Sequence, residues 1–382
     1  MISRFLLAAG LAILMVISGT TAYIYVGSRQ SKVATVPQKP IAAMPRAQAL
    51  SLPGTIYIAQ SGALYSFSAG RFHQLTPEAG WTQPALSPDG NSLVAVKREG
   101  LFSDVYRLTR FGGVTAQLTN NAAPTRSRWD TGAFAWSFYP RLSPDQGTLW
   151  MSYDGPKLAG NGYYDVDMSV WAIPVGGTVR QGRSWTNPNS YTGGDMQPVP
   201  LPSGGAIYTK YSYDSDGDRV GQLWYTNRAG SAGKALTTSA ADCAQASLSP
   251  DRQNIAMICT YKKQISYLTV ATWNGSSLGA LKTLISDQLV AQPTWAPDGS
   301  GIAYLAPGGP AAPFQLWFLP KNAYNPPPPS PIPTPVPTPG GPHNGPLPSA
   351  TPTVAPPAPK VNPIQLTTNL GFDATSPIAW LG

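Results

Sequence analysis

Ionisable side chains are scarce in this sequence. Charged residues make up 12% of its 382 residues, about half of the roughly 25% in a typical soluble domain, which disfavours coiled coils and helical arrays built on Glu and Lys. Glutamate occurs at Glu78 and Glu99, and histidine at His73 and His343. A multi-histidine metal site within one chain is therefore excluded, and a Ser-His-Asp triad would have to use one of these two histidines.

Proline and glycine, in contrast, are abundant. The chain contains 41 Pro and 38 Gly together with 11 Trp and 18 Tyr, and 42% of its residues are apolar. This composition can fill a core of ordinary density and is typical of an all-β fold with many turns. The net charge of +8 is dispersed, with its densest basic and aromatic spot at residues 126–129. Without a basic stripe, we expect no nucleic-acid binding.

An uncharged, mostly apolar stretch spans residues 5–26. As a helix it would be about 33 Å long, enough to cross the core of a bilayer. It is either an uncleaved single-pass anchor, favoured by its length and by Tyr23 and Tyr25, or a signal peptide cleaved after Ala22. Both alternatives place the remaining chain outside the cytoplasm. We assign residues 1–30 to this transmembrane signal-anchor or signal peptide and residues 31–53 to a linker.

A short signature recurs along the rest of the chain. It reads Gln-Pro-Ala-Leu-Ser-Pro-Asp-Gly at residues 83–90 and returns, with variations, at 139–146, 197–204, 245–252 and 292–299. Repeats of roughly 40–50 residues with several short strands each indicate propeller blades. Within the signature, Pro presets a turn and Asp bonds back to the local backbone. We therefore expect these aspartates to shape turns and not to catalyse a reaction.

The strand pattern around each copy predicts four antiparallel strands per blade. Residues 55–76 match strands two to four, and residues 376–381 match a first strand that has no turn after it. The two ends of the repeat region therefore complete one blade between them. This predicts an all-β, six-bladed β-propeller over residues 54–382, preceded by the transmembrane helix. The proline-rich residues 325–360 interrupt one blade between its third and fourth strands, and we expect them to be disordered.

The Ser-Pro-Asp-Gly signature at 87–90, with its relatives at 143–146, 249–252 and 296–299, resembles the WD40-like PD40 repeat of TolB-like propellers. The resemblance implies the six-bladed fold over about 54–382 and a role as a protein- or ligand-binding scaffold. The periplasmic member after which the family is named has an additional N-terminal α/β domain, for which this chain has no room. Its role in the cell envelope is therefore not implied. We expect no Gly-x-Ser-x-Gly nucleophile elbow and no α/β-hydrolase domain after the propeller, which argues against the best enzymatic alternative, a peptidase with a related propeller.

The candidate recognition surface is the face that carries the longest loops. Connections between strands two and three, and from one blade to the next, share one face of an up-and-down propeller. The long connections 120–137, 154–167, 186–196 and 212–219 all fall there. Binding residues gather on loops held by rigid scaffolds, and Trp, Tyr and Arg dominate binding hot spots. The candidate binding residues are Arg126, Arg128, Trp129, Trp136, Tyr163, Tyr164 and Tyr191.

Three carboxylates lie close together at Asp214, Asp216 and Asp218. Hard cations such as Ca²⁺ bind oxygen ligands of this kind, but the spacing departs from the EF-hand loop and no glutamate follows. The alternative is a polar hairpin loop with Gly217 in the left-handed conformation. No other cofactor is expected.

The only two cysteines are Cys243 and Cys259. If the turn at 249–252 pairs Ser247 with Ile255, Cys243 lies directly opposite Cys259, at a distance that a disulfide can bridge. An oxidising compartment outside the cytoplasm favours that bond. Two free buried thiols are the alternative, because the register can slip by one residue.

Together these features predict a monomeric propeller that is tethered to the membrane on its extracytoplasmic side. It would bind an envelope protein, a polymer or another ligand without catalysis. One alternative is a propeller hydrolase or lyase acting on an envelope polymer or peptide, which would need a pocket of convergent Asp, Arg and Tyr side chains. The other is a purely structural envelope protein, which would lack a concave site built from loops.

Overall fold

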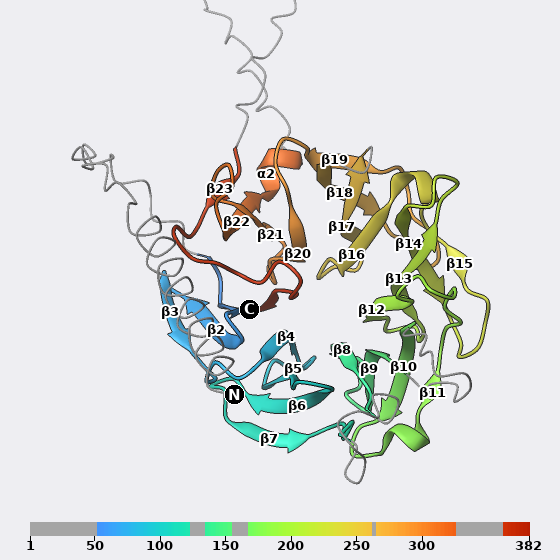
Figure 1. Ribbon diagram of the computed structural model, residues 1–382. Helices are drawn as coiled ribbons and strands as arrows, with labels where there is room; N and C mark the ends of the chain where they lie inside the picture. The colour runs from blue at the N-terminus through green and yellow to red at the C-terminus, as the bar shows by residue number, and fades with distance from the viewer. Residues whose placement is uncertain (1–51, 123–133, 155–166, 262–264, 326–361) are drawn as a thin grey trace, which may run out of the picture. The chain divides into compact units, whose positions relative to one another are not determined.

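The computed structural model describes residues 52–122, 134–154, 167–261, 265–325 and 362–382. These residues form six four-stranded antiparallel sheets, arranged as blades around a central axis (Figure 1). The predicted all-β, six-bladed propeller is thus confirmed. No helix in the described ranges is long and apolar enough to cross a membrane, and the predicted transmembrane segment lies outside them.

Five blades are each built from four consecutive strands, the first nearest the axis and the fourth at the rim (Figure 1). Blades 2 to 4 contain β4 (Trp81–Leu86), β5 (Ser92–Arg98), β6 (Ser103–Thr109) and β7 (Val114–Gln117); β8 (Ser137–Leu142), β9 (Thr148–Tyr153), β10 (Ser169–Pro174) and β11 (Arg183–Ser184); and β12 (Asp195–Pro200), β13 (Ala206–Tyr213), β14 (Arg219–Thr226) and β15 (Lys234–Ala235).

The remaining consecutive strands form blades 5 and 6, and short helical turns accompany three of the blades. The strands are β16 (Cys243–Leu248), β17 (Asn254–Tyr261), β18 (Ile265–Thr272) and β19 (Lys282–Ile285), then β20 (Ala291–Trp295), β21 (Gly301–Pro307), β22 (Phe314–Pro320) and β23 (Ile364–Gln365). The helical turns are η2 (Val179–Gln181), η3 (Ser239–Ala241) and α2 (Lys321–Tyr324).

Blade 1 joins the two ends of the repeat region, as the sequence predicts. Its strand order is β24-β1-β2-β3, with β1 (Thr55–Gln60), β2 (Ala63–Ser68), β3 (Arg71–Gln74) and the C-terminal β24 (Ala379–Leu381). β24 pairs with β1, placing Ala379 opposite Tyr57. The Trp380 indole N–H also donates to the Pro53 carbonyl at 2.7 Å. The first and last described segments therefore close the ring together.

The predicted proline-rich insertion falls within blade 6. β22 pairs with β23, so that Trp317 lies opposite Gln365, and the chain between these strands contains residues 326–361, which lie outside the described ranges. Two neighbouring strands of one sheet thus flank this segment.

Apolar side chains of the inner strands fill the spaces between blades. Val94 and Val96 of blade 2, for example, are fully buried against Leu149 and Met151 of blade 3. Both faces of these strands are covered by neighbouring blades, which is why the runs that follow the Ser-Pro-Asp turns are continuously apolar and do not alternate with polar residues.

The repeated aspartates act within their turns, as predicted. The Ser87 hydroxyl donates to the Asp89 carboxylate at 2.5 Å, and the backbone N–H of Asn91 donates to the same oxygen. The hydroxyl bond and the backbone bond hold the pKa of Asp89 well below its ordinary value, in that order of effect. The turn at Ser249 and Asp251 repeats the arrangement.

A second repeated feature lies near the start of the inner strands of blades 2 to 6 and was not predicted. Gln83, Tyr139, Gln197, Gln245 and Gln292 all have positive φ angles of 52–59°, and the pairing with the second strand shifts register beside each of them. A side chain other than glycine in this conformation costs about 1–3 kcal/mol and persists only where its surroundings fix it.

The surroundings that fix these residues are hydrogen bonds between neighbouring blades. The Gln245 backbone N–H donates to Gln197 Oε1 at 3.1 Å, and the Gln292 N–H donates to Gln245 Oε1 at 2.7 Å. At the closing blade, the Gln83 N–H donates to Ser376 Oγ at 2.8 Å. The Gln292 side chain of blade 6 donates to the Ala374 carbonyl, in the segment that leads into β24 of blade 1. We call the four glutamines, with Tyr139 and Ser376, the glutamine ring.

Tyr139 is the one departure from glutamine among blades 2 to 6. Its backbone N–H donates to Gln83 Oε1 at 2.7 Å, but its phenol lacks the amide oxygen that would accept the next bond. The Gln197 N–H donates instead to Ser152 Oγ of blade 3 at 3.0 Å. The hydrogen bond between blades 3 and 4 is thus made by the Ser152 hydroxyl. The Tyr139 side chain takes no part in that bond.

Cys243 and Cys259 lie opposite each other and form a disulfide, with Cα atoms 4.0 Å apart. The register assumed in predicting this pair was nevertheless wrong near the turn, where Ser247 pairs with Ala256 and not with Ile255. The register shift at Gln245 inserts one extra residue into β16. That shift restores the predicted pairing at Cys243.

We predict that Gln245→Ala lowers the free energy of unfolding by about 1–3 kcal/mol, because it leaves the Gln292 N–H without its acceptor. Urea denaturation of the purified chain measures the change. The matched control is Gln253→Ala, because Gln253 is exposed on a turn and should change stability by less than about 0.5 kcal/mol. Equal stabilities for the two variants would show that the ring bond contributes nothing.

We also predict that Cys243 and Cys259 are bonded in the protein exported by cells. A non-reduced digest analysed by mass spectrometry should contain one cross-linked peptide pair. Replacing both residues with Ser should lower stability by about 3 kcal/mol, the value expected for a short closed loop. Recovery of both cysteines as free thiols after export would contradict the assignment.

Candidate functional site: the loop face and the central channel

The antiparallel topology gives the ring two distinct faces. The loop face carries the connections between strands two and three and those from each blade to the next. The turn face carries the Ser-Pro-Asp turns and the connections between strands three and four. Every inner strand therefore starts at the loop face, which places the glutamine ring at the loop-face end of the central channel.

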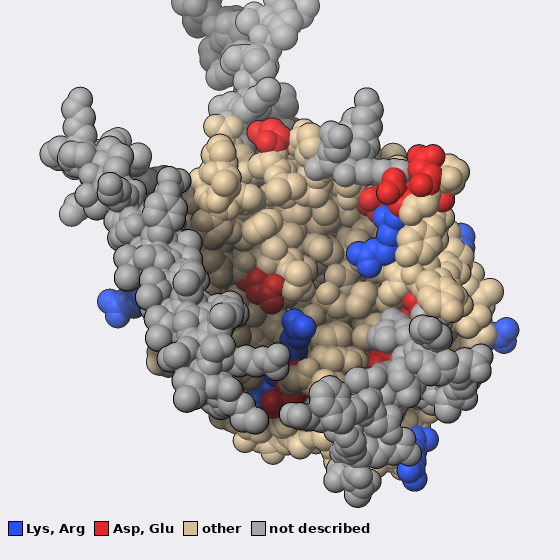
Figure 2. All heavy atoms as spheres, in the orientation of Figure 1, with Lys and Arg blue, Asp and Glu red and all other residues tan. Residues whose placement is uncertain are grey.

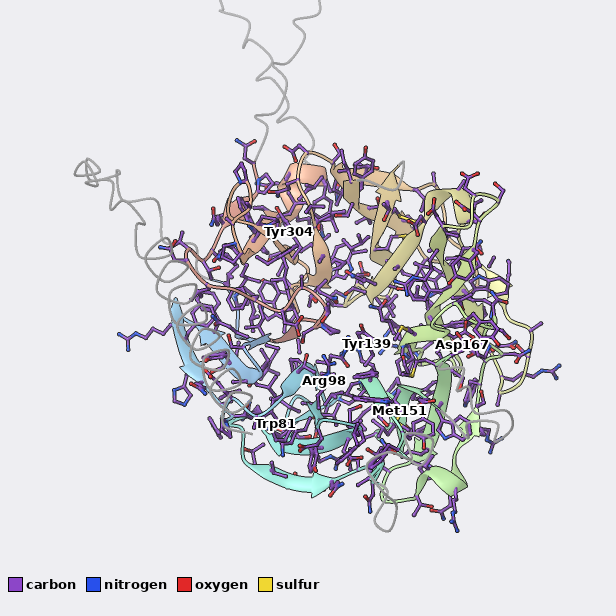
Figure 3. All side chains as sticks on the ribbon, in the orientation of Figure 1. Trp81, Arg98, Tyr139, Met151, Asp167 and Tyr304 are labelled. Carbon is purple, nitrogen blue, oxygen red and sulfur yellow. A yellow bond between two sulfur atoms is a disulfide. The ribbon has the colours of Figure 1, made fainter. Side chains whose placement is uncertain are left out.

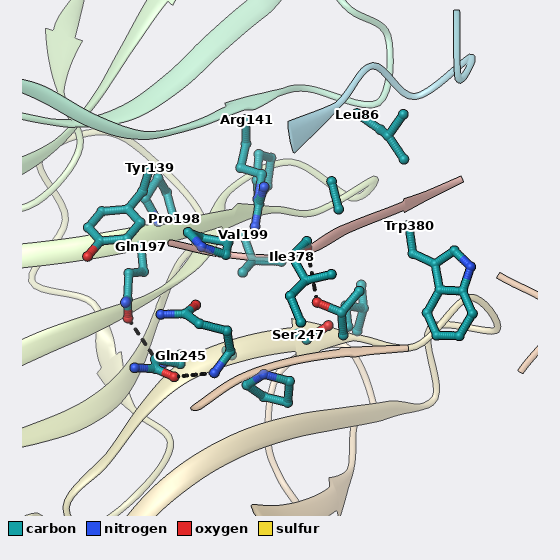
Figure 4. A pocket seen from close by; sticks show the side chains of 18 of the residues that line it. Leu86, Tyr139, Arg141, Gln197, Pro198, Val199, Gln245, Ser247, Ile378 and Trp380 are labelled. Carbon is teal, nitrogen blue, oxygen red and sulfur yellow. Dashed lines mark hydrogen bonds between the residues drawn. The ribbon is translucent and has the colours of Figure 1, made fainter. Parts of the chain in front are cut away.

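The central channel contains a cavity of about 330 Å³. Side chains of the inner strands of blades 2 to 6 and of the closing strand line it, and Figure 4 shows these lining residues with the bonds of the glutamine ring across one side. Among the described lining residues, Arg141 carries a formal charge and the others are neutral. The channel is thus a mostly uncharged space with one cation in its wall.

Tyr139 lines the loop-face end of this channel. Its hydroxyl points across the opening and lies 3.5 Å from the carbonyl oxygen of Thr375, in the segment that leads into β24. Burial, followed by the nearby Tyr211, raises the pKa of Tyr139 to about 12. The phenol is therefore neutral at physiological pH, a hydrogen-bond donor and acceptor and not a base.

Cationic side chains stacked on aromatic rings lie around the mouth. Arg219 lies 4.8 Å above the Tyr211 ring on blade 4, and Arg98 of blade 2 lies 5.9 Å from the Phe138 ring. Both arginines are exposed, and Figure 3 shows Arg98 and Tyr139 toward the centre of the ring. An exposed cation held over a ring is positioned for a partner at little conformational cost.

Trp136, one of the predicted binding residues, extends this cluster. Its ring stacks on Phe138 with centroids 5.8 Å apart and planes 15° apart, so Trp136 and Arg98 both contact the Phe138 ring. The structure thus places Trp136 on the loop face, as the sequence analysis predicts.

Tyr191, a second predicted residue, is 76% exposed on the loop face of blade 4. The Asp167 carboxylate accepts hydrogen bonds from the backbone N–H groups of Tyr191, Thr192 and Gly193 at 2.5–2.9 Å. Tyr213, itself 52% exposed, donates its hydroxyl to the Tyr191 carbonyl at 2.8 Å. The loop is therefore clamped in place, and the two tyrosines present a fixed aromatic surface.

A buried ion pair supports the same loop from below. Lys210 Nζ lies 3.2 Å from Asp195 Oδ1, and the Asp195 side chain is fully buried. Lys210 also donates to the Asn187 carbonyl at 2.6 Å. Burial raises the pKa of Asp195 while Lys210 opposes that shift. Truncating either partner would strand a buried charge, so this pair fixes the loop and is not available to a ligand.

Five of the seven predicted binding residues lie outside the described ranges: Arg126, Arg128, Trp129, Tyr163 and Tyr164. Figure 2 shows a ring face that is hollowed at its centre, with acidic side chains gathered at the upper right and single charged side chains elsewhere.

The acidic cluster forms a hairpin loop between β13 and β14. Asp214 accepts the backbone N–H groups of Asp216 and Asp218 through one carboxylate oxygen, and Gly217 takes the left-handed conformation with φ of +81°. No group of three or more metal-ligating side chains in the described ranges is arranged to hold an ion. The three aspartates thus lie in a hairpin loop with Gly217 at its left-handed position.

The expectation that the chain contains no Gly-x-Ser-x-Gly sequence is wrong, because one occurs at residues 275–279, between β18 and β19. A nucleophile elbow needs a sharp strand-to-helix turn. Here Ser277 sits in an exposed strand-to-strand turn, where the Asn274 side chain donates to its hydroxyl at 2.7 Å. The strand β19, and not a helix, comes next after this turn, so the local geometry differs from that of a nucleophile elbow.

The sequence analysis missed Tyr139, Tyr211, Arg98 and Arg141, all of which the fold brings to the channel or its mouth. A usable signal was present for two of them. Tyr139 replaces the glutamine of the repeat, and Arg141 is a charged residue at a position where the other copies have Ala, Val, Ser or Thr. A residue that departs from an otherwise regular repeat does not make the contact that its counterparts make, and it is therefore a candidate for a functional role.

Comparisons with solved structures support the fold. TolB from Acinetobacter baumannii aligns over 71% of this chain and 62% of its own, with 17% identity and a TM-score of 0.53. A putative TolB from Agrobacterium tumefaciens aligns over 87% and 99%, with 13% identity and a TM-score of 0.52. Hydrazine synthase of Kuenenia stuttgartiensis aligns over 70% and 43%, with 10% identity and a TM-score of 0.51.

Comparisons by sequence add nothing to this. No protein-family model matches the chain, and no curated protein matches it. The likeness to the solved structures establishes similarity of fold. The same architecture occurs in proteins with different functions, so function must be argued from the site. The described part of the chain has the fold of a TolB-like six-bladed propeller.

Proposed function

We propose that this protein is a binding scaffold outside the cytoplasm, held at the membrane by residues 5–26, with the loop face around the channel mouth as its recognition surface. The observation that carries the proposal is the concentration of fixed aromatic and cationic groups on that one face, where Trp136 is partly buried and the others are exposed. Arg98, Trp136, Tyr191 and Tyr213 all lie there.

The way these groups are held supports recognition over a purely structural role. Asp167 and Lys210 fix the loop that presents Tyr191, and the ring bonds fix the strands below it. Ordering a surface before binding lowers the entropy lost when a partner docks. A structural envelope protein would not need exposed rings beside an open cavity.

The extracytoplasmic location rests on two features. The N-terminal stretch is long enough to span a bilayer or to serve as an export signal. The Cys243–Cys259 pair is placed for a disulfide, and such bonds persist in oxidising compartments. An envelope protein or polymer is therefore the expected class of partner.

The catalytic alternative is less well supported by the described site. No carboxylate and no imidazole lines the described wall of the channel cavity. General acid–base chemistry needs such a group within hydrogen-bond reach of the substrate. Tyr139 stays protonated, because its pKa is about 12.

We predict that the triple variant Arg98→Ala/Tyr191→Ala/Tyr213→Ala captures less than about a tenth of the partner that the unmodified chain captures from envelope extracts. Removing hot-spot side chains of these types typically costs 2 kcal/mol or more. Quantitative mass spectrometry of captured material measures the loss. Because the three side chains are exposed, the melting temperature should change little.

The matched control is Phe111→Ala. Phe111 is 82% exposed and lies between β6 and β7, hence on the turn face. Its loss should leave capture unchanged. Loss of capture in the Phe111 variant, with full capture by the triple variant, would place recognition on the turn face and contradict the proposal.

A further inference from the structure

Arg141 is a charged residue in a channel wall whose other described lining residues are uncharged. It lies in β8, near the turn-face end of the channel, and its neighbours in the wall include Leu142, Val199 and Ile378 (Figure 4). No ion pair of the described residues includes Arg141, and burial lowers the pKa of its guanidinium to about 10. The group is still protonated at physiological pH, so a positive charge sits in the channel wall, and no described residue that lines the cavity carries an opposing charge.

An uncompensated charge of this kind is costly to the fold. A cation taken partly out of water loses hydration that an apolar wall does not replace, and such positions are usually filled by uncharged residues. The equivalent positions of the other blades follow this rule, with Ala85, Val199, Ser247 and Thr294. A charge kept where stability would favour a neutral residue indicates a ligand of opposite sign.

The chemistry of the wall specifies that ligand. A guanidinium presents parallel N–H donors that match the two oxygens of a carboxylate. The apolar neighbours of Arg141 favour an uncharged, apolar body next to that carboxylate. The cavity of about 330 Å³ is large enough for a small organic acid or for the last residues of an extended peptide, and small for a folded partner.

We propose that the central channel binds a carboxylate carried on an apolar body, with Arg141 as the partner of the anion. The inference rests on the proposed function only in taking the loop-face mouth as the entrance. A ligand entering there passes the Tyr139 ring and then reaches Arg141, two residues further along β8, or about 6 Å at the rise of a strand. Its source is either a free organic acid or the C-terminus of a polypeptide.

Calorimetric titration of the purified full chain tests this. The probes are hexanoate and a short peptide ending in Val-Leu, each compared with its uncharged amide, together with inorganic phosphate. We expect the carboxylates to bind and the amides to bind at least tenfold more weakly. A peptide that binds tighter than hexanoate identifies a polypeptide terminus as the source, and the reverse order identifies an organic acid. Phosphate binding as tightly as the carboxylates would overturn the assigned ligand class.

The variant Arg141→Met removes the charge and keeps a side chain of similar length. It should weaken carboxylate binding at least tenfold and, without ligand, raise the melting temperature, because it removes an unpaired charge. A guanidinium with a structural task would instead lower the melting temperature when lost. Arg141→Lys should keep the charge but lose the paired donors, giving an intermediate affinity. The control Arg252→Met changes an exposed arginine of a turn and should bind as the unmodified chain does.

The proposal is overturned if neither carboxylate binds, or if Arg141→Met binds both as well as the unmodified chain does. Those outcomes are independent of the capture experiment above. Undiminished partner capture by Arg141→Met, together with absent carboxylate binding, would refute the channel site and leave the loop-face proposal standing. Carboxylate binding together with full partner capture by the loop-face triple variant would refute the loop-face proposal and leave the channel site standing.

Discussion

The hydrogen bond from the backbone of one inner strand to the side chain of its neighbour holds the channel in shape. Each bond needs a backbone N–H turned toward the preceding blade, and the positive φ angles at Gln83, Gln245 and Gln292 provide that orientation. The strain is tolerated because the bond and the apolar packing between blades fix the geometry together. Ser376 brings the C-terminal strand into the same set of bonds, so closure of blade 1 and the shape of the channel depend on one interaction.

Much of this architecture is visible in the sequence because it repeats. The Ser-Pro-Asp turns, the apolar strands after them and the incomplete first and last units together predict six blades and their closure. The inter-blade bonds are not visible in the same way, since Gln197 and Gln245 are partners across 48 residues and nothing local links them. The disulfide shows the same limit. A uniform register gave the right partner for Cys243, but the pairing of Ser247 depends on a shift that the turn chemistry does not encode.

The site is less predictable than the fold for a physical reason. Long loops containing Trp136 and Tyr191 can be recognised as candidates from composition, and the structure places both on the loop face. The channel residues come from different blades, and their meeting depends on ring closure. Tyr139 and Arg141 are informative because each breaks a repeat: one gives up the glutamine bond, and the other places a charge where its counterparts are neutral. The scaffold supplies rigidity, and these departures supply the chemistry.

The central claim is that a rigid ring presents one face, and not the other, to its partner. Site-specific photo-crosslinking in living cells tests this most directly. The crosslinking amino acid would replace Tyr191 on the loop face or Phe111 on the turn face, which are 76% and 82% exposed. The account predicts a defined adduct from position 191 and none from position 111. An adduct from position 111 with none from position 191 would contradict it.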